Sequence, residues 1–226
     1  MIKVKKHPTA MLKDDTERNT SENISALILA GGKSRRLGKD KRLLIYKKDP
    51  LILRALRSAK SITQEVYVLI STKEDEEVLS RILGDVPFIL DSSPGSGPLG
   101  ALAGALSLMS TDSDYVLLLS ADYPLLTGGF LLRMKVFLEE EITKPDVLVP
   151  LFEDVPQVTC AFYRRSIAEG MQRAFEQGER SLRRWVESHE KGVKYIKEET
   201  WTEWESHSVF FNLNTPQDYE RFMNME

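Results

Sequence analysis

The sequence is poor in cysteine and has no long apolar run. Cys160 is the single cysteine among 226 residues, which excludes an internal disulfide. Such sparing use of cysteine is typical of a reducing compartment, so we expect the protein in the cytoplasm. Cys160 also lies inside a segment expected to be a strand, which favours a packed thiol over a nucleophile. Because every apolar run is shorter than the ~20 residues of a membrane helix, no transmembrane segment is predicted.

The sequence also lacks a large excess of charge of one sign, and it has few histidines. The formal net charge is -3, which argues against a broad surface for nucleic acid. Any anion site must therefore be a local group of cations. The three histidines lie in polar surroundings without metal-ligand spacing, and no Ser-His-Asp arrangement can be assembled from them. A histidine general base is not expected.

The first 22 residues differ in composition from the rest of the chain. Lys3, Lys5 and Lys6 are not followed by the apolar core of a secretory signal. We expect residues 1–22 to form a flexible polar tail. The remaining residues, 23–226, are long enough to bury a sizeable core, and we expect them to form a single domain.

Short apolar runs alternate with amphipathic segments along residues 23–226. This alternation is typical of an α/β fold with a doubly wound, mostly parallel sheet in three α/β/α layers. Expected strands are 24–30, 66–71, 86–90, 115–120, 147–150, 157–163, 194–196 and 209–213. Expected helices are 50–61, 75–83, 99–109, 166–176, 181–189 and 216–223. Ligands of such sheets bind beyond the carboxyl ends of the strands, which selects the loops after Ala30, Leu90, Ser120 and Leu213.

The loop after Ala30 combines glycine with positive charge. Gly31-Gly32 lets backbone N–H groups approach an anion, because no Cβ intervenes. The cations that follow are Arg35, Arg36, Lys39 and Lys41. Together they predict a site for the phosphates of a nucleotide; the alternative is a solvated basic turn.

Two familiar phosphate-binding motifs do not fit this loop. Gly32-Lys33-Ser34 matches the end of a Walker A motif, but Leu27 stands where that motif requires a glycine. The dinucleotide motif G-x-G-x-x-G also fails, because no third glycine follows until Gly38. The loop is therefore a phosphate-binding sequence of a third kind.

The loop after Ser120 presents one acidic residue. The apolar strand 115–120 delivers Asp122 at its carboxyl end, and Pro124 then turns the chain away. Mg²⁺ prefers one or two carboxylates together with water and phosphate oxygens, so Asp122 is a predicted metal ligand. The alternative is an aspartate that caps the turn after a strand.

The remaining two loops are rich in small and amide side chains. Asp91 begins a segment whose glycines, ending at Gly97 before Pro98, could pass close to a base or ribose; the alternative is a plain connecting loop. In the strand expected over 209–213, alternation would place Asn212 and Asn214 on one face, where both amides could reach one ligand. The alternative is a strand end followed by a helix cap.

The run Leu29–Lys41 resembles the signature L-A-G-G-x-S-x-R-M/L-G-x-D-K of molybdenum cofactor guanylyltransferases. The resemblance extends over residues 24–222 and includes the segments at Asp91, Asp122 and Asn212. It implies a single Rossmann-like nucleotidyltransferase domain that transfers GMP from GTP to molybdopterin, with Mg²⁺ and release of pyrophosphate. Gly100-Ala101 departs from the family, which has these two residue types in the opposite order.

The resemblance also implies a role for each matching residue. Arg36, Lys41 and Asp122 would be catalytic, with Asp122 on the metal. The nucleotide would be bound by Leu29, Ala30, Gly31, Gly32, Arg36, Lys41, Asp91 and Gly97. The acceptor would be bound by Asn212, Asn214 and Arg180. Gln157, in a segment where relatives have H-P or Q-P, is a further site candidate.

Two other classes of function stay open. One is cytidylyl transfer to the same pterin, or nucleotidyl transfer to a sugar phosphate. Relatives that use CTP mostly begin L-A-A-G, whereas Leu29–Gly32 favours guanine. The other is a non-catalytic relative that binds nucleotide or cofactor for a partner. The expected partners are GTP, molybdopterin and proteins of molybdoenzyme maturation, with no nucleic acid or membrane; the oligomeric state stays open.

Overall fold

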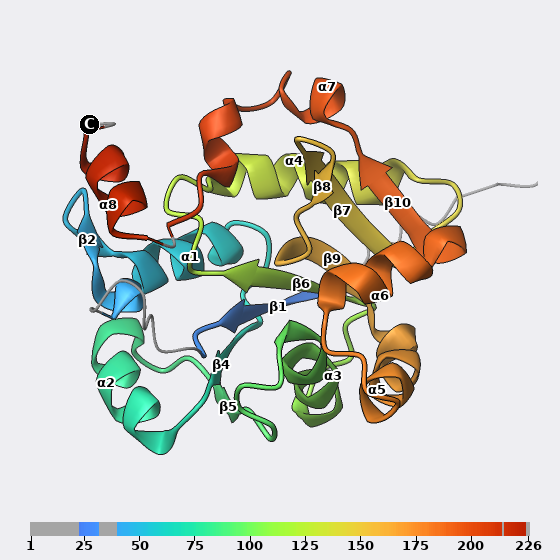
Figure 1. Cartoon of the computed structure of the whole chain (residues 1–226), viewed down its shortest axis with the longest axis horizontal. Coiled ribbons are helices and arrows are strands. Elements are labelled where there is room, and N and C mark those ends of the chain that lie inside the picture. The colour runs from blue at the N-terminus through green and yellow to red at the C-terminus, as the bar shows by residue number, and fades with distance from the viewer. Residues whose placement is uncertain (1–22, 32–39, 214, 225–226) are drawn as a thin grey trace, which may run out of the picture.

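The computed structural model describes residues 23–31, 40–213 and 215–224. Its main sheet has the strand order β10-β7-β9-β6-β1-β4-β5, with β8 paired to β7 (Figure 1). The strands of this sheet are β1 (Ile24–Leu29), β4 (Val66–Ile70), β5 (Phe88–Leu90), β6 (Tyr115–Ser120), β7 (Val147–Phe152), β8 (Val155–Pro156), β9 (Cys160–Arg164) and β10 (Val193–Ile196). A separate hairpin pairs β2 (Ile45–Tyr46) with β3 (Asp49–Pro50).

Most neighbouring strands of the main sheet run parallel. β1 pairs in parallel with both β4 and β6, β4 with β5, and β7 with β10. β9 lies between β6 and β7 and is antiparallel to both. The start of β9 therefore lies at the same edge as the carboxyl end of β6. The prediction of a doubly wound, mostly parallel sheet is confirmed.

Helices cover both faces of the sheet, as the alternation of side chains along β1 requires. Ala26 and Ile28 belong to a core shared with α1, α2 and α4, whereas Leu27 belongs to a core shared with α3, α5 and α6. Figure 1 shows α4 above the sheet and α3 beside α5 below it. The helices are α1 (Leu51–Lys60), α2 (Lys73–Leu83), α3 (Pro98–Leu108), α4 (Gly128–Glu140), α5 (Ala168–Glu176), α6 (Leu182–Ser188), α7 (Glu198–Trp201) and α8 (Pro216–Met223). In the described part of the chain, none is long and apolar enough to cross a membrane.

The expected strand over 209–213 is wrong. Residues His207–Phe210 form a 3₁₀ helix, and the chain then runs without regular structure to Leu213. Val209 and Phe210 are both buried although they are adjacent, which is incompatible with the alternation of a half-buried strand. The backbone N–H of Phe211 donates to the carbonyl of Ser208 and so closes the helical turn.

Two helices, α4 and α7, were not predicted, and one region is placed differently. α4 was missed although Phe130, Leu131, Met134 and Leu138 form its buried stripe. In the segment expected as strand 157–163, the strand starts only at Cys160, because the N–H of Cys160 closes a turn on the carbonyl of Gln157. The predicted tail, residues 1–22, lies outside the described residues.

Candidate functional site

A cavity of about 440 Å³ opens at the carboxyl edge of the sheet, where β1, β4, β5 and β6 end. Its lining residues are Leu29, Ala30, Gly31, Lys41, Arg42, Leu69, Ser71, Asp91, Gly95, Gly97, Pro98, Ala101, Ser120, Ala121, Asp122 and Thr159. Predicted site residues from three separate loops therefore meet in one cavity. Gly32, Arg36 and Asn214 lie outside the described residues.

Lys41 and Asp122 form an ion pair at this edge. Lys41 Nζ lies 2.5 Å from Asp122 Oδ2, and the two side chains are 17% and 25% exposed. Asp122 follows β6, and its N–H donates to the Ser120 hydroxyl at 3.2 Å. Lys41 begins a 3₁₀ helix, Lys41–Leu43, whose first residue follows the capping residue Asp40. The pair brings the end of the glycine-rich signature against the acidic tip of the next strand.

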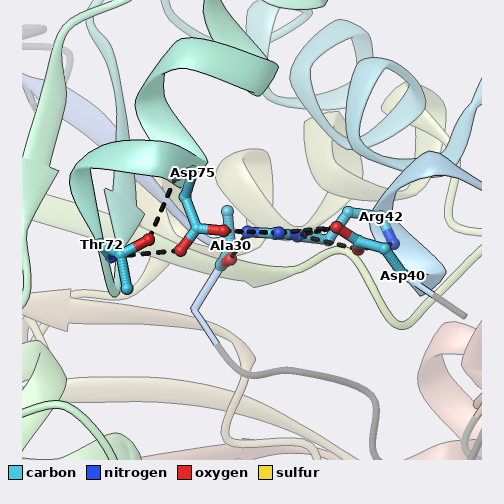
Figure 2. A network of polar contacts seen from close by, with 5 residues as sticks. All are labelled: Ala30, Asp40, Arg42, Thr72 and Asp75. Carbon is cyan, nitrogen blue, oxygen red and sulfur yellow. Dashed lines mark hydrogen bonds and ion pairs between the residues drawn. The ribbon is translucent and has the colours of Figure 1, made fainter. Parts of the chain in front are cut away.

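Arg42, which directly follows Lys41, ties this 3₁₀ helix to the sheet (Figure 2). It is 8% exposed and donates from Nη1 to the carbonyl oxygen of Ala30 at 2.6 Å. Its Nη2 donates to Asp40 Oδ2 and to Asp75 Oδ1, each at 2.6 Å, and its Nε donates to Asp40 Oδ1 at 2.8 Å. The planar guanidinium thus serves three segments at once, which the point charge of a lysine could not do.

The carboxylate of Asp75 is held from its other side by the start of α2. Thr72 and Asp75 form a reciprocal capping box, in which the Thr72 N–H donates to Asp75 Oδ2 at 3.1 Å (Figure 2). Burial alone would raise the pKa of Asp75, but the hydrogen bond and charge of Arg42 lower it. Burial alone would likewise lower the pKa of Arg42, and the two aspartates together raise it. Arg42 and Asp75 are therefore both ionised at neutral pH.

Sequence reasoning missed Arg42 and Asp75. Arg42 directly follows the signature run Leu29–Lys41, and the Thr72–Asp75 spacing is that of a capping box, so each left a local signal. Their contact spans 33 positions along the chain, and no local pattern predicts it.

Two glycines at the cavity are required by close packing. A Cβ on Gly31 would lie 2.7 Å from the hydroxyl of Ser71, at the end of β4. Gly97 has φ +89°, and a Cβ there would lie 2.6 Å from the carbonyl oxygen of Arg180. The loop after β5 is thereby packed against the loop between α5 and α6. Asp91 fixes the start of this loop by accepting a hydrogen bond from the N–H of Ser93 at 2.9 Å.

The structure does not bring the side chain of Arg180 to the cavity. Its Nη1 donates to the carbonyl of Phe175 at 2.6 Å, and its guanidinium lies 4.3 Å from the centre of the Phe175 ring. The backbone of Arg180 packs on Gly97, but the side chain turns back on its own loop. An acceptor contact through Arg180 stays a prediction.

Asn212 lies close to the site although the strand expected there does not form. The N–H of Leu213 donates to the carbonyl of Asp122 at 3.1 Å, which places this segment beside the ion pair. Asn212 is exposed, and Leu213 is buried against Tyr46 and Phe222. The placement of Asn212 beside Asp122 therefore comes from a loop contact rather than from a shared strand face.

The donor set is suited to a metal only together with phosphate. No group of three histidine, cysteine or acidic side chains that could hold an ion occurs in the part of the chain that the structure describes. Mg²⁺ is often bound through one or two carboxylates plus substrate phosphates and water, and Asp122 offers one such carboxylate at the cavity. The residues present fit that arrangement.

The mostly parallel sheet, the glycine-bounded cavity and the Lys41–Asp122 pair together are the features expected of a nucleotidyltransferase of the Rossmann-like type. Residues 26–193 match the family model of the MobA-like NTP transferase domain, and the chain belongs to that family.

Named relatives agree with this assignment. The "probable molybdenum cofactor guanylyltransferase" of Trichormus variabilis is 30% identical to this chain, with 87% of this chain and 88% of that protein covered. The molybdenum cofactor guanylyltransferase of Campylobacter jejuni is 31% identical, with 88% and 95% covered. Among solved structures, molybdopterin-guanine dinucleotide biosynthesis protein A of Archaeoglobus fulgidus has a TM-score of 0.72 at 25% identity, with 89% and 97% covered.

Proposed function

We propose that this protein transfers GMP from GTP to molybdopterin and releases pyrophosphate. The observation that carries the proposal is the Lys41–Asp122 pair, which lies in the same cavity as Gly31 and Gly97. The names of the relatives support GTP and molybdopterin as the two substrates.

The attacking group of this reaction is already an anionic phosphate, so the site needs little base chemistry. Rate enhancement would come from alignment of two anions and from neutralisation of their charge. Lys41 supplies a positive charge whose position is fixed by the neighbouring Arg42 network. We assign Lys41, with Arg36, to the triphosphate and the leaving pyrophosphate.

We further propose Mg²⁺ as the cofactor, held by Asp122. When bound, the ion would supply charge neutralisation and orientation of phosphate oxygens. The ammonium group of Lys41 already lies against the Asp122 carboxylate, so that carboxylate is suited to a cationic neighbour.

We propose the remaining roles as the sequence predicts them. The nucleotide would lie against the backbone of Leu29–Gly32 and the loop that contains Asp91 and Gly97. The acceptor would be bound near Asn212 and Asn214, with Arg180 as a further contact.

We also propose a cytoplasmic location, on the basis of the single cysteine, and contact with proteins of molybdoenzyme maturation.

The test is pyrophosphate release by the purified protein with GTP, molybdopterin and Mg²⁺. Release in step with formation of a guanine dinucleotide is the expected result, and the same mixture with CTP is expected to be slow. Release with CTP but not with GTP would contradict guanylyl transfer. Binding of GTP without release from any mixture would contradict the assignment as an enzyme.

A further inference from the structure

A buried tyrosine lies directly behind the Lys41–Asp122 pair and has not been given a role. Tyr123 follows Asp122, is 8% exposed, and packs edge-on against Phe210 with 5.9 Å between ring centres. Its hydroxyl lies 3.2 Å from Gln157 Oε1 and 3.1 Å from Thr159 Oγ1. Of these three residues, Thr159 lines the cavity.

The turn that carries Gln157 and Thr159 is fixed on several sides by the backbone. The N–H of Gln157 donates to the carbonyl of Pro150, at 2.9 Å, and the Ser120 N–H donates to the carbonyl of Thr159, also at 2.9 Å. The Tyr163 hydroxyl donates to the carbonyl of Val158 at 2.6 Å. Thr159, which lines the cavity, is therefore held there by a rigid support.

The direction of each hydrogen bond follows from the number of protons available. Gln157 Nε2 donates to the carbonyl of Val155 at 2.9 Å, so its Oε1, which can only accept, faces Tyr123. A phenol has one proton, and Tyr123 uses it on Gln157. Thr159 must then donate its own proton to the Tyr123 oxygen. A phenol keeps its proton at neutral pH, so this proton is available.

We infer that Thr159 accepts a hydrogen bond from an N–H or O–H group of the acceptor substrate, with Tyr123 and Gln157 as positioning residues. With its proton committed to Tyr123, Thr159 has lone pairs to offer a ligand and no donor. It therefore discriminates against an ionised phosphate oxygen and in favour of a neutral donor, such as the N–H groups of a pterin.

The sheet order assigns this contact to the acceptor rather than the nucleotide. Asp91 and Gly97 follow β5 at one edge of the sheet, and Thr159 precedes β9, on the opposite side of β1 and β6. Asp122 lies between them at the end of β6. The assignment to molybdopterin rests on the proposed function, whereas the acceptor-only character of Thr159 rests on the geometry alone.

The test compares Thr159→Val, which removes the hydroxyl, with Thr159→Ser, which keeps it. Thr159→Val is expected to raise the KM for molybdopterin roughly three- to tenfold, the scale of one neutral hydrogen bond, with the KM for GTP unchanged. Thr159→Ser is expected to restore most of the affinity. Thr202→Val is the matched control, since its hydroxyl bonds to the Glu198 carbonyl on α7, outside the cavity lining.

A double-mutant cycle tests whether Tyr123 acts through Thr159. Tyr123→Phe frees the Thr159 proton and is expected to weaken molybdopterin binding less than Thr159→Val does. The double variant is expected to be no weaker than Thr159→Val alone, because the two changes remove one contact. An additive loss would show a separate structural role for Tyr123 and would overturn the positioning assignment.

Calorimetric titration with molybdopterin separates this inference from the proposed function. If the wild type binds molybdopterin but transfers no GMP, the proposed function fails and the Val-to-Ser comparison still decides the role of Thr159. Equal affinity of the Val and Ser variants, a higher KM for GTP instead, or no binding of molybdopterin to the wild type would each overturn the inference.

Discussion

The two sides of the cavity are built in different ways. The β5 side, defined by Ser71, Asp91 and Gly97, consists of loops that directly follow β4 and β5. The β9 side, defined by Thr159, comes from the turn that precedes the antiparallel strand β9, and the segment at Leu213 bonds to the Asp122 carbonyl nearby. Lys41 and Asp122 stand between the two sides.

The two sides also differ in the kind of interaction that holds each of them in place. On the β5 side, charged groups in Arg42, Asp40 and Asp75 lock the strand ends together. On the β9 side, neutral hydroxyl and amide groups do the same for the turn at Gln157–Thr159. The charged network fixes the position of the 3₁₀ helix that carries Lys41, and the neutral one suits recognition of an organic group.

The largest effect is expected at the residues between the two sides. Asp122→Ala and Lys41→Ala should each lower turnover on the order of 10²–10³-fold, the scale of one lost electrostatic contact to the transition state. Stability should change little, because a partly exposed ion pair contributes about 0–1 kcal/mol. Pyrophosphate release measures the first quantity and urea unfolding the second.

Lys135→Ala is the matched control for this prediction, since Lys135 pairs with Glu139 on α4, outside the cavity lining. If Asp122→Ala or Lys41→Ala kept a turnover near that of Lys135→Ala, the substituted residue would have no part in the reaction.

Arg42→Met should show how much the β5 side depends on its charged network. Removal of the guanidinium leaves Asp75, 13% exposed, without its cationic partner, and the unfolding free energy should fall by about 3 kcal/mol. Turnover should also fall, because the 3₁₀ helix that carries Lys41 loses its bond to Ala30. Unfolding by urea and steady-state rates check the two effects separately.

Arg57→Met provides the contrast, because Arg57 is 60% exposed in its pair with Asp49. It should change stability by less than about 1 kcal/mol. Equal losses for the Arg42 and Arg57 variants would mean that burial gives the Arg42 network no special importance.

A pair of glycine substitutions measures the contact between the β5 side and the Arg180 loop. Gly95 and Gly97 have φ of +84° and +89°, so alanine strains the backbone at both positions, by about 1–3 kcal/mol. Only at Gly97 would the new Cβ meet another segment, the Arg180 carbonyl. Gly97→Ala should therefore cost about 1–3 kcal/mol more than Gly95→Ala in urea unfolding. Equal costs would show that the two loops separate freely.

The fold could be predicted largely from local sequence. Apolar runs such as 115–120 are buried strands, and α8 forms over 216–223 as the sequence predicts, with Thr215 as N-cap and Asp218 at N3. The strand expected over 209–213 failed because short apolar runs do not distinguish a strand from a 3₁₀ helix. What decides there is tertiary: the N–H of Leu213 bonds to Asp122 instead of to a strand.

The site was predictable to the extent that its residues follow strand ends. The loops that contain Lys41, Asp91 and Asp122 could be chosen because parallel strands deliver their carboxyl ends to one edge, and the family resemblance then singled out Lys41 and Asp91. Thr159 and Asp75 could not be chosen in this way. Thr159 precedes an antiparallel strand, so the rule of carboxyl ends does not select it. Asp75 reaches the site through Arg42, across a separation in sequence that no local pattern records.

The smallest expected effect is a pH dependence of stability that belongs to the β5 side alone. Because Arg42 lowers the pKa of Asp75 in the folded state, the unfolded chain takes up its proton at a higher pH than the folded one. This contribution is complete above the unfolded pKa of about 4 and is lost as the pH falls through the folded pKa. The unfolding free energy of the wild type should therefore decline more steeply below pH 4 than that of Asp75→Asn. Parallel declines in urea titrations from pH 7 to pH 3 would show that Asp75 is not stabilised by Arg42. Thr159→Val, which removes a neutral group of the β9 side, should decline as the wild type does.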